Sequence, residues 1–564
     1  MAYWVNLFQS VKLMLLNVSR RFNYPSLVGL LFGTVFFAFS LTPSLLPRPF
    51  LIQGVLSGLS FTAGYAVGVF AMWLWHYLQL PEFSKKWALI LKRSATTLCL
   101  LLTISFIWQA STWQNSIREM MGMELQQGHQ PVLLGLMSAA VFLVALTVAR
   151  LFNWVMHSLA VRWRRYVSSR VSYLTSFTVA LVLFWSVIDG VLVTALMRTA
   201  DSSFQQLDAL IEDDLPMPVR SIQTGSQESL ISWEELGREG RRFIADAPTE
   251  QQLSNFFEKD TKAPIRVYVG LASAESSELR AQLALKELKR VGGFDRSALV
   301  IVTPTGTGWI DPNAQDTLEY LLRGDVASVA AQYSYLNSPL TLFTQAEYGR
   351  DAARALFDKI YSYWRTLPRD SRPKLYLSGL SLGAMNSDLS FDLFDIIDEP
   401  FDGALWVGPP FRNETWRRVT ADRDSGSPAW LPVFRDGSVV RFMNQYQALD
   451  ESGDSPWGAF RIAFLQYASD PIVFFSPHIA WNEPDWMREP RGPDVSPDLR
   501  WFPIVTMLQL AADTVVGTAP KGFGHEYAAE HYIHAWRSLM DLESWSDEKL
   551  DKLLALFSDS ETEK

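Results

Sequence analysis

Cysteine is nearly absent from the sequence, and this scarcity excludes two kinds of site. Cys99 is the only cysteine among 564 residues, so the chain has neither a disulfide framework nor a cysteine-based metal site. Basic residues are in the minority, with 50 Lys and Arg against 59 Asp and Glu. Because the acidic part of the chain carries no basic stripe, nucleic acid is not an expected partner. The residues predict no metal and no cofactor.

The charges are divided unevenly along the chain. Residues 1–200 hold 15 Lys and Arg against 4 Asp and Glu, a balance of +11, whereas the remainder has a balance of −20. A chain of this length is too long for one compact core, so two domains are expected. The asymmetry predicts that these domains occupy different environments.

Long apolar runs fill the basic part. A transmembrane helix needs roughly 20 apolar residues, and five nearly uncharged stretches are of this length: 26–46, 51–80, 94–113, 131–149 and 171–197. Soluble core helices seldom run this long without a polar face. The sequence therefore predicts a transmembrane bundle of about five helices over residues 26–200, with the lipid bilayer as its partner.

Residues 1–25 show a different pattern. Apolar side chains such as Trp4, Leu7 and Val11 follow helical spacing, and polar side chains lie mostly opposite. A signal peptide would have a compact apolar run and a small-residue cleavage site. We interpret the segment as an interfacial amphipathic helix; the alternative is a tail that is only partly helical.

Cations alternate between rich and poor connections in the bundle. The N-terminal tail and the second-to-third and fourth-to-fifth connections are rich in Lys and Arg, whereas the other two hold Arg48 and then Arg118 beside two glutamates. Cytoplasmic loops carry an excess of these cations. The N-terminus is therefore predicted to be cytoplasmic, and five crossings place everything after Arg198 outside the cytoplasm.

One carboxylate, Asp189, lies within the fifth predicted span. An ionisable residue at membrane depth usually faces the bundle interior or water. Two interpretations stay open: Asp189 marks a proton or substrate path, or it lies close enough to the outer surface to be hydrated.

The acidic part alternates between strand and helix patterns. Residues 201–260 are polar and indicate a linker and approach segment. Strands are predicted at 265–271, 298–303, 327–333, 374–378, 403–408 and 461–467, with helices such as 278–290, 345–365 and 384–397 between them. Such alternation is typical of a mainly parallel sheet. Residues 261–564 are therefore predicted to form the catalytic domain, an α/β domain.

Two loop-rich segments, 411–460 and 477–503, interrupt this alternation. They carry six tryptophans: Trp416, Trp430, Trp457, Trp481, Trp486 and Trp501. Tryptophan has an apolar body and a polar tip, which suits a membrane–water boundary. We interpret the segments as cap insertions, and packed core is the alternative for their tryptophans.

The strongest chemical signal is the run from Lys374 to Ala384, in which a short apolar strand leads through Gly-Leu-Ser-Leu-Gly into a helix. A serine on such a tight turn projects its hydroxyl, and the helix N-terminus favours developing negative charge. The pentapeptide alone is a weak signal, but the strand–turn–helix context indicates a nucleophile elbow. Ser381 is the predicted nucleophile.

An elbow of this kind predicts an acid and then a histidine later in the chain. Asp470 follows a late strand, and it is favoured over Asp402, which precedes one. His525 lies in a glycine-containing loop, whereas its competitors His531 and His534 fall in the next helix. The predicted triad is Ser381, Asp470 and His525, in which the histidine accepts the serine proton and the aspartate holds its tautomer.

The oxyanion of the reaction needs hydrogen-bond donors. The backbone N–H of Leu382 directly follows the nucleophile, and the loop Pro304-Thr305-Gly306-Thr307-Gly308-Trp309 follows an earlier strand. Glycines let backbone amides turn toward a substrate, so Leu382, Thr305 and Gly306 are the predicted oxyanion hole. A phosphate cradle is disfavoured, because no Gly-Lys-Ser/Thr follows the glycines.

Several motifs together resemble a bacterial family of membrane α/β-hydrolases with a hydrophobic N-terminal domain. They are Ser40-Leu-Thr-Pro-Ser-Leu-Leu-Pro-Arg48, Leu236-Gly-Arg-Glu-Gly240, the 304–309 loop, Gly403-Ala-Leu-Trp-Val-Gly-Pro-Pro410 and Gly524-His525. Leu380 departs from the glutamate associated with that elbow position. The resemblance implies an α/β-hydrolase fold with a hydrolase activity in the bacterial cytoplasmic (inner) membrane, and it supplies no substrate.

Three functions remain in competition. The leading one is a periplasmic serine esterase or lipase-like hydrolase that acts on an acyl ester, with a lipid or lipid-linked ester as the predicted substrate. The second is acyl transfer to an envelope acceptor through the same triad. The third is a non-catalytic transport or envelope-assembly protein, which Asp189 alone supports, and the absence of a visible repeat argues against a typical transporter.

Overall fold

The structure is a computed structural model that describes residues 26–562 except 82–83, 127–130, 194–204, 206, 213–214, 337–340, 342–345, 452, 454, 489 and 543–544. The chain forms two compact units. Unit 1 contains Met1–Met197, Pro477–Glu483 and Asp498–Gly517, and unit 2 contains Arg198–Ser476, Pro484–Pro497 and Thr518–Lys564. The predicted interfacial helix over residues 1–25 lies outside the described residues.

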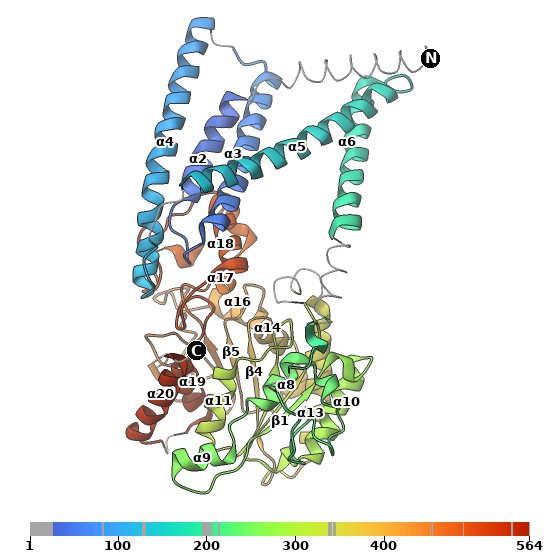
Figure 1. Cartoon of the computed structure of the whole chain (residues 1–564), viewed down its shortest axis with the longest axis vertical. Coiled ribbons are helices and arrows are strands. Elements are labelled where there is room, and N and C mark those ends of the chain that lie inside the picture. Colours follow the sequence, from blue (N-terminus) through green and yellow to red (C-terminus); the bar gives the residue numbers. More distant parts are fainter. Residues whose placement is uncertain are drawn as a thin grey trace. The chain divides into compact units, whose positions relative to one another are not determined.

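Unit 1 is helical (Figure 1). Its helices are α2 (Leu27–Ser40), α3 (Phe50–Tyr77), α4 (Lys85–Met120), α5 (Pro131–Trp163) and α6 (Ser169–Trp185), which continues as the π-helix η1 (Ser186–Val193). Helix α2 packs on α3 and α4, α3 packs on α5, and α5 packs on α6. Pro49, just before α3, fits this position because the first turn of a helix does not need its N–H. Asp189, which the sequence places in the fifth predicted span, lies in η1.

Among the residues that the structure describes, four helices, rather than the expected five, are long and apolar enough to cross a membrane. They are α3, α4, α5 and α6 with the start of η1. The first predicted span corresponds to α2, which is 14 residues long and therefore extends about 21 Å, against roughly 30 Å for a hydrocarbon core. The difference arises because the apolar run continues past Ser40 into the turn before Pro47, where the chain is no longer helical.

Glycines let α3 approach its neighbours closely. A Cβ at Gly64 would lie 2.5 Å from the carbonyl oxygen of Phe32 on α2, and one at Gly68 would lie 2.6 Å from that of Val28. Closer to its N-terminus, α3 packs Gly54 and Gly58 against α5. A Cβ at Gly58 would lie 2.8 Å from the carbonyl oxygen of Ser138. Small residues spaced by four are the usual means by which apolar helices pack in lipid.

Replacing Gly64 by leucine is expected to destabilise unit 1, because the new side chain would meet backbone rather than a movable side chain. Overpacking of this kind costs about 1–3 kcal/mol or more. The measurement is the thermal unfolding midpoint of the full chain in detergent. Gly135→Leu on α5 is the matched control, since nothing lies within 4 Å of a Cβ there. Equal midpoints for the two variants would contradict the expected close packing.

A helix from late in the sequence completes unit 1. Helix α18 (Val505–Val516) contacts α2 and α3, and the ring of Phe502 stacks on Phe39 with centroids 3.9 Å apart. This segment lies inside the predicted catalytic range 261–564, and part of it was interpreted as a cap. Its sequence, VTMLQLAADTVV, is apolar around most of the helix, which suits packing among membrane helices.

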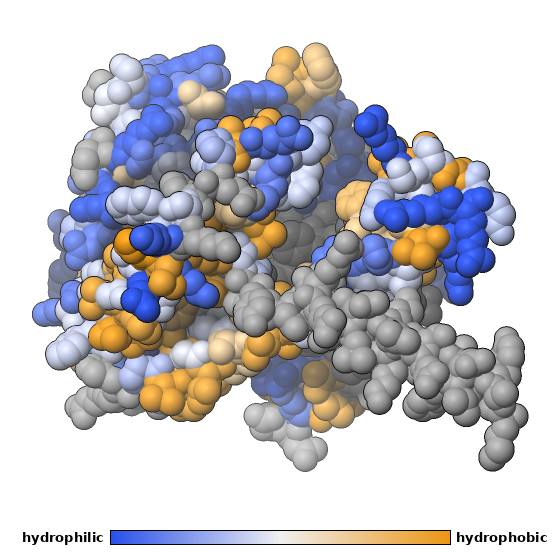
Figure 2. Space-filling model, turned by 90° about the horizontal axis from the view of Figure 1, so that it is seen from above, coloured by the Kyte–Doolittle hydropathy of each residue, from blue (hydrophilic) through white to orange (hydrophobic). Residues whose placement is uncertain are grey.

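Large apolar side chains are exposed along the helices of unit 1. They include Phe70, Trp73, Trp87, Leu101, Trp108 and Val132, each at least half exposed. Figure 2 shows orange apolar patches among blue hydrophilic residues on the face seen from above. Soluble proteins rarely expose so many large apolar side chains along their helices, whereas a lipid bilayer would cover them. These helices therefore indicate that the protein associates with a membrane.

Unit 2 is built on a seven-stranded parallel sheet in the order β1-β3-β2-β4-β5-β7-β6. The strands are β1 (Ile265–Val269), β2 (Ala298–Thr303), β3 (Val326–Ala331), β4 (Lys374–Leu380), β5 (Gly403–Val407), β6 (Val440–Met443) and β7 (Arg461–Leu465). The strands are almost entirely buried, as expected of a parallel sheet covered on both faces. All six predicted strands are present, and the mainly parallel sheet is confirmed.

Helices cover both faces of this sheet (Figure 1). One group of helices that pack together comprises α10 (Ser277–Arg290), α13 (Ala346–Trp364) and α14 (Leu382–Asp388). A second group comprises α11 (Pro312–Leu321), α19 (Ala529–Met540) and α20 (Asp547–Thr562). The predicted linker includes α8 (Gly237–Ala245) and α9 (Glu250–Phe257). Helix α8 packs on β1, so this segment is part of unit 2.

Strand β6 was not predicted. It lies in the segment 411–460, which was interpreted as loop-rich, and it is only four residues long at the edge of the sheet. Its sequence Val-Arg-Phe-Met contains a buried arginine, whose guanidinium donates to the carbonyls of Gly437 and Leu449. A charged residue in so short a run conceals the strand pattern.

Candidate active site

Ser381 occupies a strained turn between β4 and α14. Its backbone torsions are φ 56° and ψ −122°, a region that a residue with a side chain rarely adopts. The turn is fixed on both sides, because the Ser381 N–H donates to the carbonyl of Val407 at 2.9 Å and its carbonyl accepts from Met385 at 3.2 Å. The residue is 4% exposed. Strain held in this way at one residue points to a functional site.

Two glycines make this turn possible. A Cβ on Gly379 would lie 2.4 Å from the carbonyl carbon of Gly383, and a Cβ on Gly383 would lie 2.1 Å from the carbonyl oxygen of Thr303. Neither position has room for a side chain. The second contact also brings the elbow against the end of β2, where the loop 304–309 begins.

Asp470 and His525 form a hydrogen-bonded pair. Asp470 follows β7 at the N-terminus of α17 (Pro471–Phe474) and is fully buried. Its Oδ2 lies 2.7 Å from Nδ1 of His525, and its Oδ1 accepts from the N–H of Ile472 at 2.8 Å. Burial lowers the pKa of His525, but the charge and hydrogen bond of Asp470 outweigh burial and the pKa is raised.

The strand β5 brings this pair toward the elbow. Val407 accepts the Ser381 N–H, and the next residue, Gly408, has φ +50°. A Cβ on Gly408 would lie 2.6 Å from Cε1 of His525, so the imidazole lies directly against the backbone beside the elbow. Ser381 and Asp470 therefore follow the carboxyl ends of β4 and β7, which flank β5, and His525 comes from the loop before α19. The carboxyl end of the sheet is where α/β folds place their ligands.

The competing residues occupy other environments. His531 and His534 lie in α19, and Nδ1 of His531 is hydrogen-bonded to the hydroxyl of Tyr467. Burial lowers the pKa of His531 to about 4. Asp402 lies before β5, at the opposite end from Asp470, and accepts from the N–H of Leu375 at 2.8 Å.

The backbone N–H groups predicted to form the oxyanion hole differ in the hydrogen bonds that they make in the structure. Leu382 is the first residue of α14, a position whose N–H has no partner within its own helix. The N–H of Thr305, in contrast, donates to the carbonyl of Trp309 at 2.9 Å. Thr305 would have to exchange this bond to act as a donor. Gly306 follows in the same loop, which adjoins the elbow through Thr303 and Pro304.

Sequence reasoning missed Tyr527. Its hydroxyl donates to Oδ2 of Asp470 at 2.7 Å, alongside His525. Burial and the neighbouring carboxylate raise the pKa of Tyr527 well above its usual value, so it remains a donor. Its position two residues after His525 was the only signal. A second buried carboxylate, Asp311, accepts from Tyr532 at 2.9 Å, and burial raises its pKa to about 6.

A groove of about 870 Å³ adjoins the elbow helix in unit 2. Met385, one turn after Ser381, lies on its wall, and Trp416 and Trp486 of the predicted caps line it as buried side chains. Five arginines and three carboxylates also line the groove. Of the remaining cap tryptophans, Trp430 and Trp457 donate their indole N–H within unit 2, Trp501 donates within unit 1, and Trp481 is 60% exposed.

Comparisons with known proteins agree with this architecture. A model of an alpha/beta-hydrolase family matches residues 265–553, which include every strand of the sheet. A model of the N-terminus of an alpha/beta-hydrolase family matches residues 41–248. The searches of curated proteins and of solved structures gave no match. With more than half of its length covered by the first model and its sheet arranged as described, the chain belongs to this alpha/beta-hydrolase family, together with its N-terminal domain.

Proposed function

We propose that this protein is a serine hydrolase that cleaves an acyl ester through an acyl-enzyme on Ser381. The observation that carries the proposal is the strained backbone of Ser381, held at φ 56° beside the Asp470–His525 pair. A nucleophile elbow holds its serine on such a strained strand-to-helix turn. The fold and family support a hydrolase, and the roles of the individual residues are part of the proposal.

The first half-reaction uses the two nitrogens of His525 differently. Asp470 accepts from Nδ1–H, which leaves Nε2 as the base that takes the proton of Ser381 as its oxygen attacks the ester carbonyl. The Leu382 N–H stabilises the oxyanion. The alcohol then leaves with the proton from His525, and water repeats the sequence to release the acid. Tyr527 and Ile472 hold Asp470 in place throughout.

An active-site serine probe tests this proposal. A fluorophosphonate should label the full chain in detergent, and the modified peptide should contain Ser381. Ser381→Ala should abolish labelling, whereas Ser378→Ala, three residues earlier in β4, should leave it intact. Labelling of another residue, or none with the native chain, would refute the serine mechanism and favour a non-catalytic protein.

We further propose that the substrate is a lipid or lipid-linked acyl ester. The groove beside the elbow helix combines aromatic walls with an excess of arginines over carboxylates, which suits an amphiphile with an acidic group. The apolar helices of unit 1 would keep the enzyme at a membrane, where such esters reside.

The full chain is expected to prefer long-chain esters in micelles or liposomes to short water-soluble esters. Among long-chain esters, an anionic head group should lower KM, because arginines outnumber carboxylates along the groove. Rates with Ser381→Ala give the background. A higher kcat/KM for short soluble esters would contradict a lipid substrate.

We propose that the catalytic unit lies on the periplasmic side of a bacterial inner membrane. The alternation of cationic connections in residues 1–200 supports this orientation. The assignment also requires α2 to cross with the four longer helices, because an even number of crossings would leave both ends on one side. An alkaline phosphatase reporter decides between these alternatives.

A reporter fused after Arg198 should be active, and one fused after Arg164 should be silent. By the same alternation, a reporter fused after Arg48 should be active and one fused after Arg93 should be silent. If the fusion after Arg48 were silent and that after Arg198 were also silent, α2 would not cross and the catalytic unit would be cytoplasmic.

A further inference from the structure

Unit 1 contains a cavity of about 450 Å³ whose wall is mostly apolar. Ile104, Ile107 and Trp108 of α4 and Leu134 of α5 form much of this wall. Ile104 and Trp108 are also exposed, so the cavity opens to the surface of unit 1. The volume lies in the range of pockets that bind small ligands. All of its residues belong to Met1–Met197, so the cavity is a feature of unit 1 alone.

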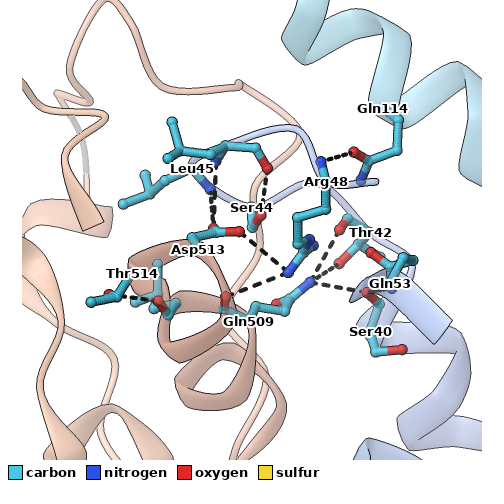
Figure 3. A network of polar contacts seen from close by, with 12 residues as sticks. Ser40, Thr42, Ser44, Leu45, Arg48, Gln53, Gln114, Gln509, Asp513 and Thr514 are labelled. Atoms are coloured by element: carbon cyan, nitrogen blue, oxygen red, sulfur yellow. Dashed lines mark hydrogen bonds and ion pairs between the residues drawn. The ribbon is translucent and has the colours of Figure 1, made fainter. Parts of the chain in front are cut away.

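Five polar side chains line the cavity, among them Arg48, Gln53 and Gln114. Gln114 accepts from the Arg48 N–H at 2.9 Å, and Gln53 donates to the carbonyl of Ser40 at 2.8 Å. Figure 3 shows Arg48 between Gln114 on one side and Asp513 with Gln509 on the other. The cavity therefore has a polar head and an apolar body.

The guanidinium of Arg48 is fully buried but only partly used. Its Nη1 lies 3.5 Å from a carboxylate oxygen of Asp513 and donates to the carbonyl of Gln509 at 3.4 Å. Its Nε and Nη2 have no hydrogen-bond partner among the described residues, and the same holds for Nε2 of Gln114. Leaving a charged donor buried and unpaired costs more than leaving a neutral one so.

We propose that this cavity binds a single-chain amphiphile with an anionic oxygen head group. The oxygens of a carboxylate or phosphate would accept from Nε and Nη2 of Arg48, in the paired geometry that a guanidinium favours, and from Nε2 of Gln114. The acyl chain would fill the apolar body between α4 and α5. This site is separate from Ser381 and does not depend on the hydrolase reaction.

Photolabelling of the full chain in detergent tests the site. The first probe is a long-chain fatty acid with a diazirine in its chain, and labelled peptides should come from α4 and the start of α5. A lysophosphatidic acid with the same chain distinguishes a phosphate head from a carboxylate. An amine with the same chain is the head-group control, and labelling by the amine as strong as that by both anionic probes would overturn the proposal.

Ala110→Phe fills the cavity from α4, because Ala110 lines it. Labelling should fall about tenfold or more, as expected for the loss of a well-packed ligand. Ala88→Phe is the matched control, since Ala88 is exposed on the same helix, and it should label normally. Equal labelling of these two variants would also overturn the proposal.

Arg48→Lys tests the head group without removing the positive charge that faces Asp513. The lysine lacks the Nε and Nη2 donors, so labelling by the anionic probes should fall about tenfold, while labelling by the amine should not. This variant decides the question if Ala110→Phe does not fold. Ser381→Ala should label as the native chain does, so failure of the hydrolase proposal would leave this result unchanged.

Discussion

Ser381→Ala and His525→Ala are each expected to reduce ester hydrolysis by several orders of magnitude, up to about 10⁶-fold in kcat. In the proposed mechanism the serine supplies the nucleophile, and the histidine, bonded through Nδ1 to Asp470 at 2.7 Å, supplies the base. Because the two act in one proton transfer, the double variant should be scarcely slower than either single variant. Steady-state kinetics on one ester, with thermal unfolding to verify folding, measures this.

His531→Ala is the matched control for the histidine. His531 lies in α19 with its Nδ1 bonded to Tyr467, and its replacement should leave kcat within a few-fold of native. If His525→Ala kept native hydrolysis and His531→Ala abolished it, the base would have to be reassigned to His531.

Asp470→Asn should lower kcat by roughly 10⁴-fold at most, less than loss of the serine or histidine. The amide no longer favours the tautomer that carries the proton on Nδ1. The variant also changes the pH profile. Asp470 raises the pKa of His525, and the base must be neutral to accept a proton, so activity rises as pH increases through that pKa.

Removing the negative charge should lower the pKa of His525 and move the acid limb of kcat/KM toward lower pH. The measurement is kcat/KM from pH 4 to pH 9 for the native chain and the variant. Asp402→Asn is the control, because Asp402 lies at the other end of β5, and its acid limb should not move. An unchanged limb in Asp470→Asn would mean that Asp470 does not govern the base.

Local sequence was sufficient to predict the elbow. The apolar strand, the two glycines and the following helix all lie within Lys374–Asp388, and the clashes at Gly379 and Gly383 explain why no other residues fit. The partners Asp470 and His525 were predictable from their order and from the strand ends that precede them. The sequence could not show that Gly408 makes room for the imidazole, because this contact joins residues far apart in the chain.

The remaining features depend on distant partners. Tyr527 reaches Asp470 across 57 positions, and neither residue carries a local sign of the bond. The apolar run that begins at Ser26 does not reveal that the helix ends at Ser40, because the following turn is equally apolar. Helix α18 resembles a buried helix of any soluble domain, and its packing beside α2 and α3 rests on contacts such as that of Leu45 with Asp513, 468 positions away.

The position of α18 in the sequence determines when the packing of unit 1 can be completed during synthesis. Helices α2 to α6 leave the ribosome first, and domains generally fold as units during synthesis, the N-terminal one first. Arg48 nevertheless meets its carboxylate only when Asp513 has been synthesised, after all seven strands of the sheet. Until then Arg48 lacks the carboxylate that faces it in the finished fold, so unit 1 is completed only after the strands of unit 2 have been synthesised.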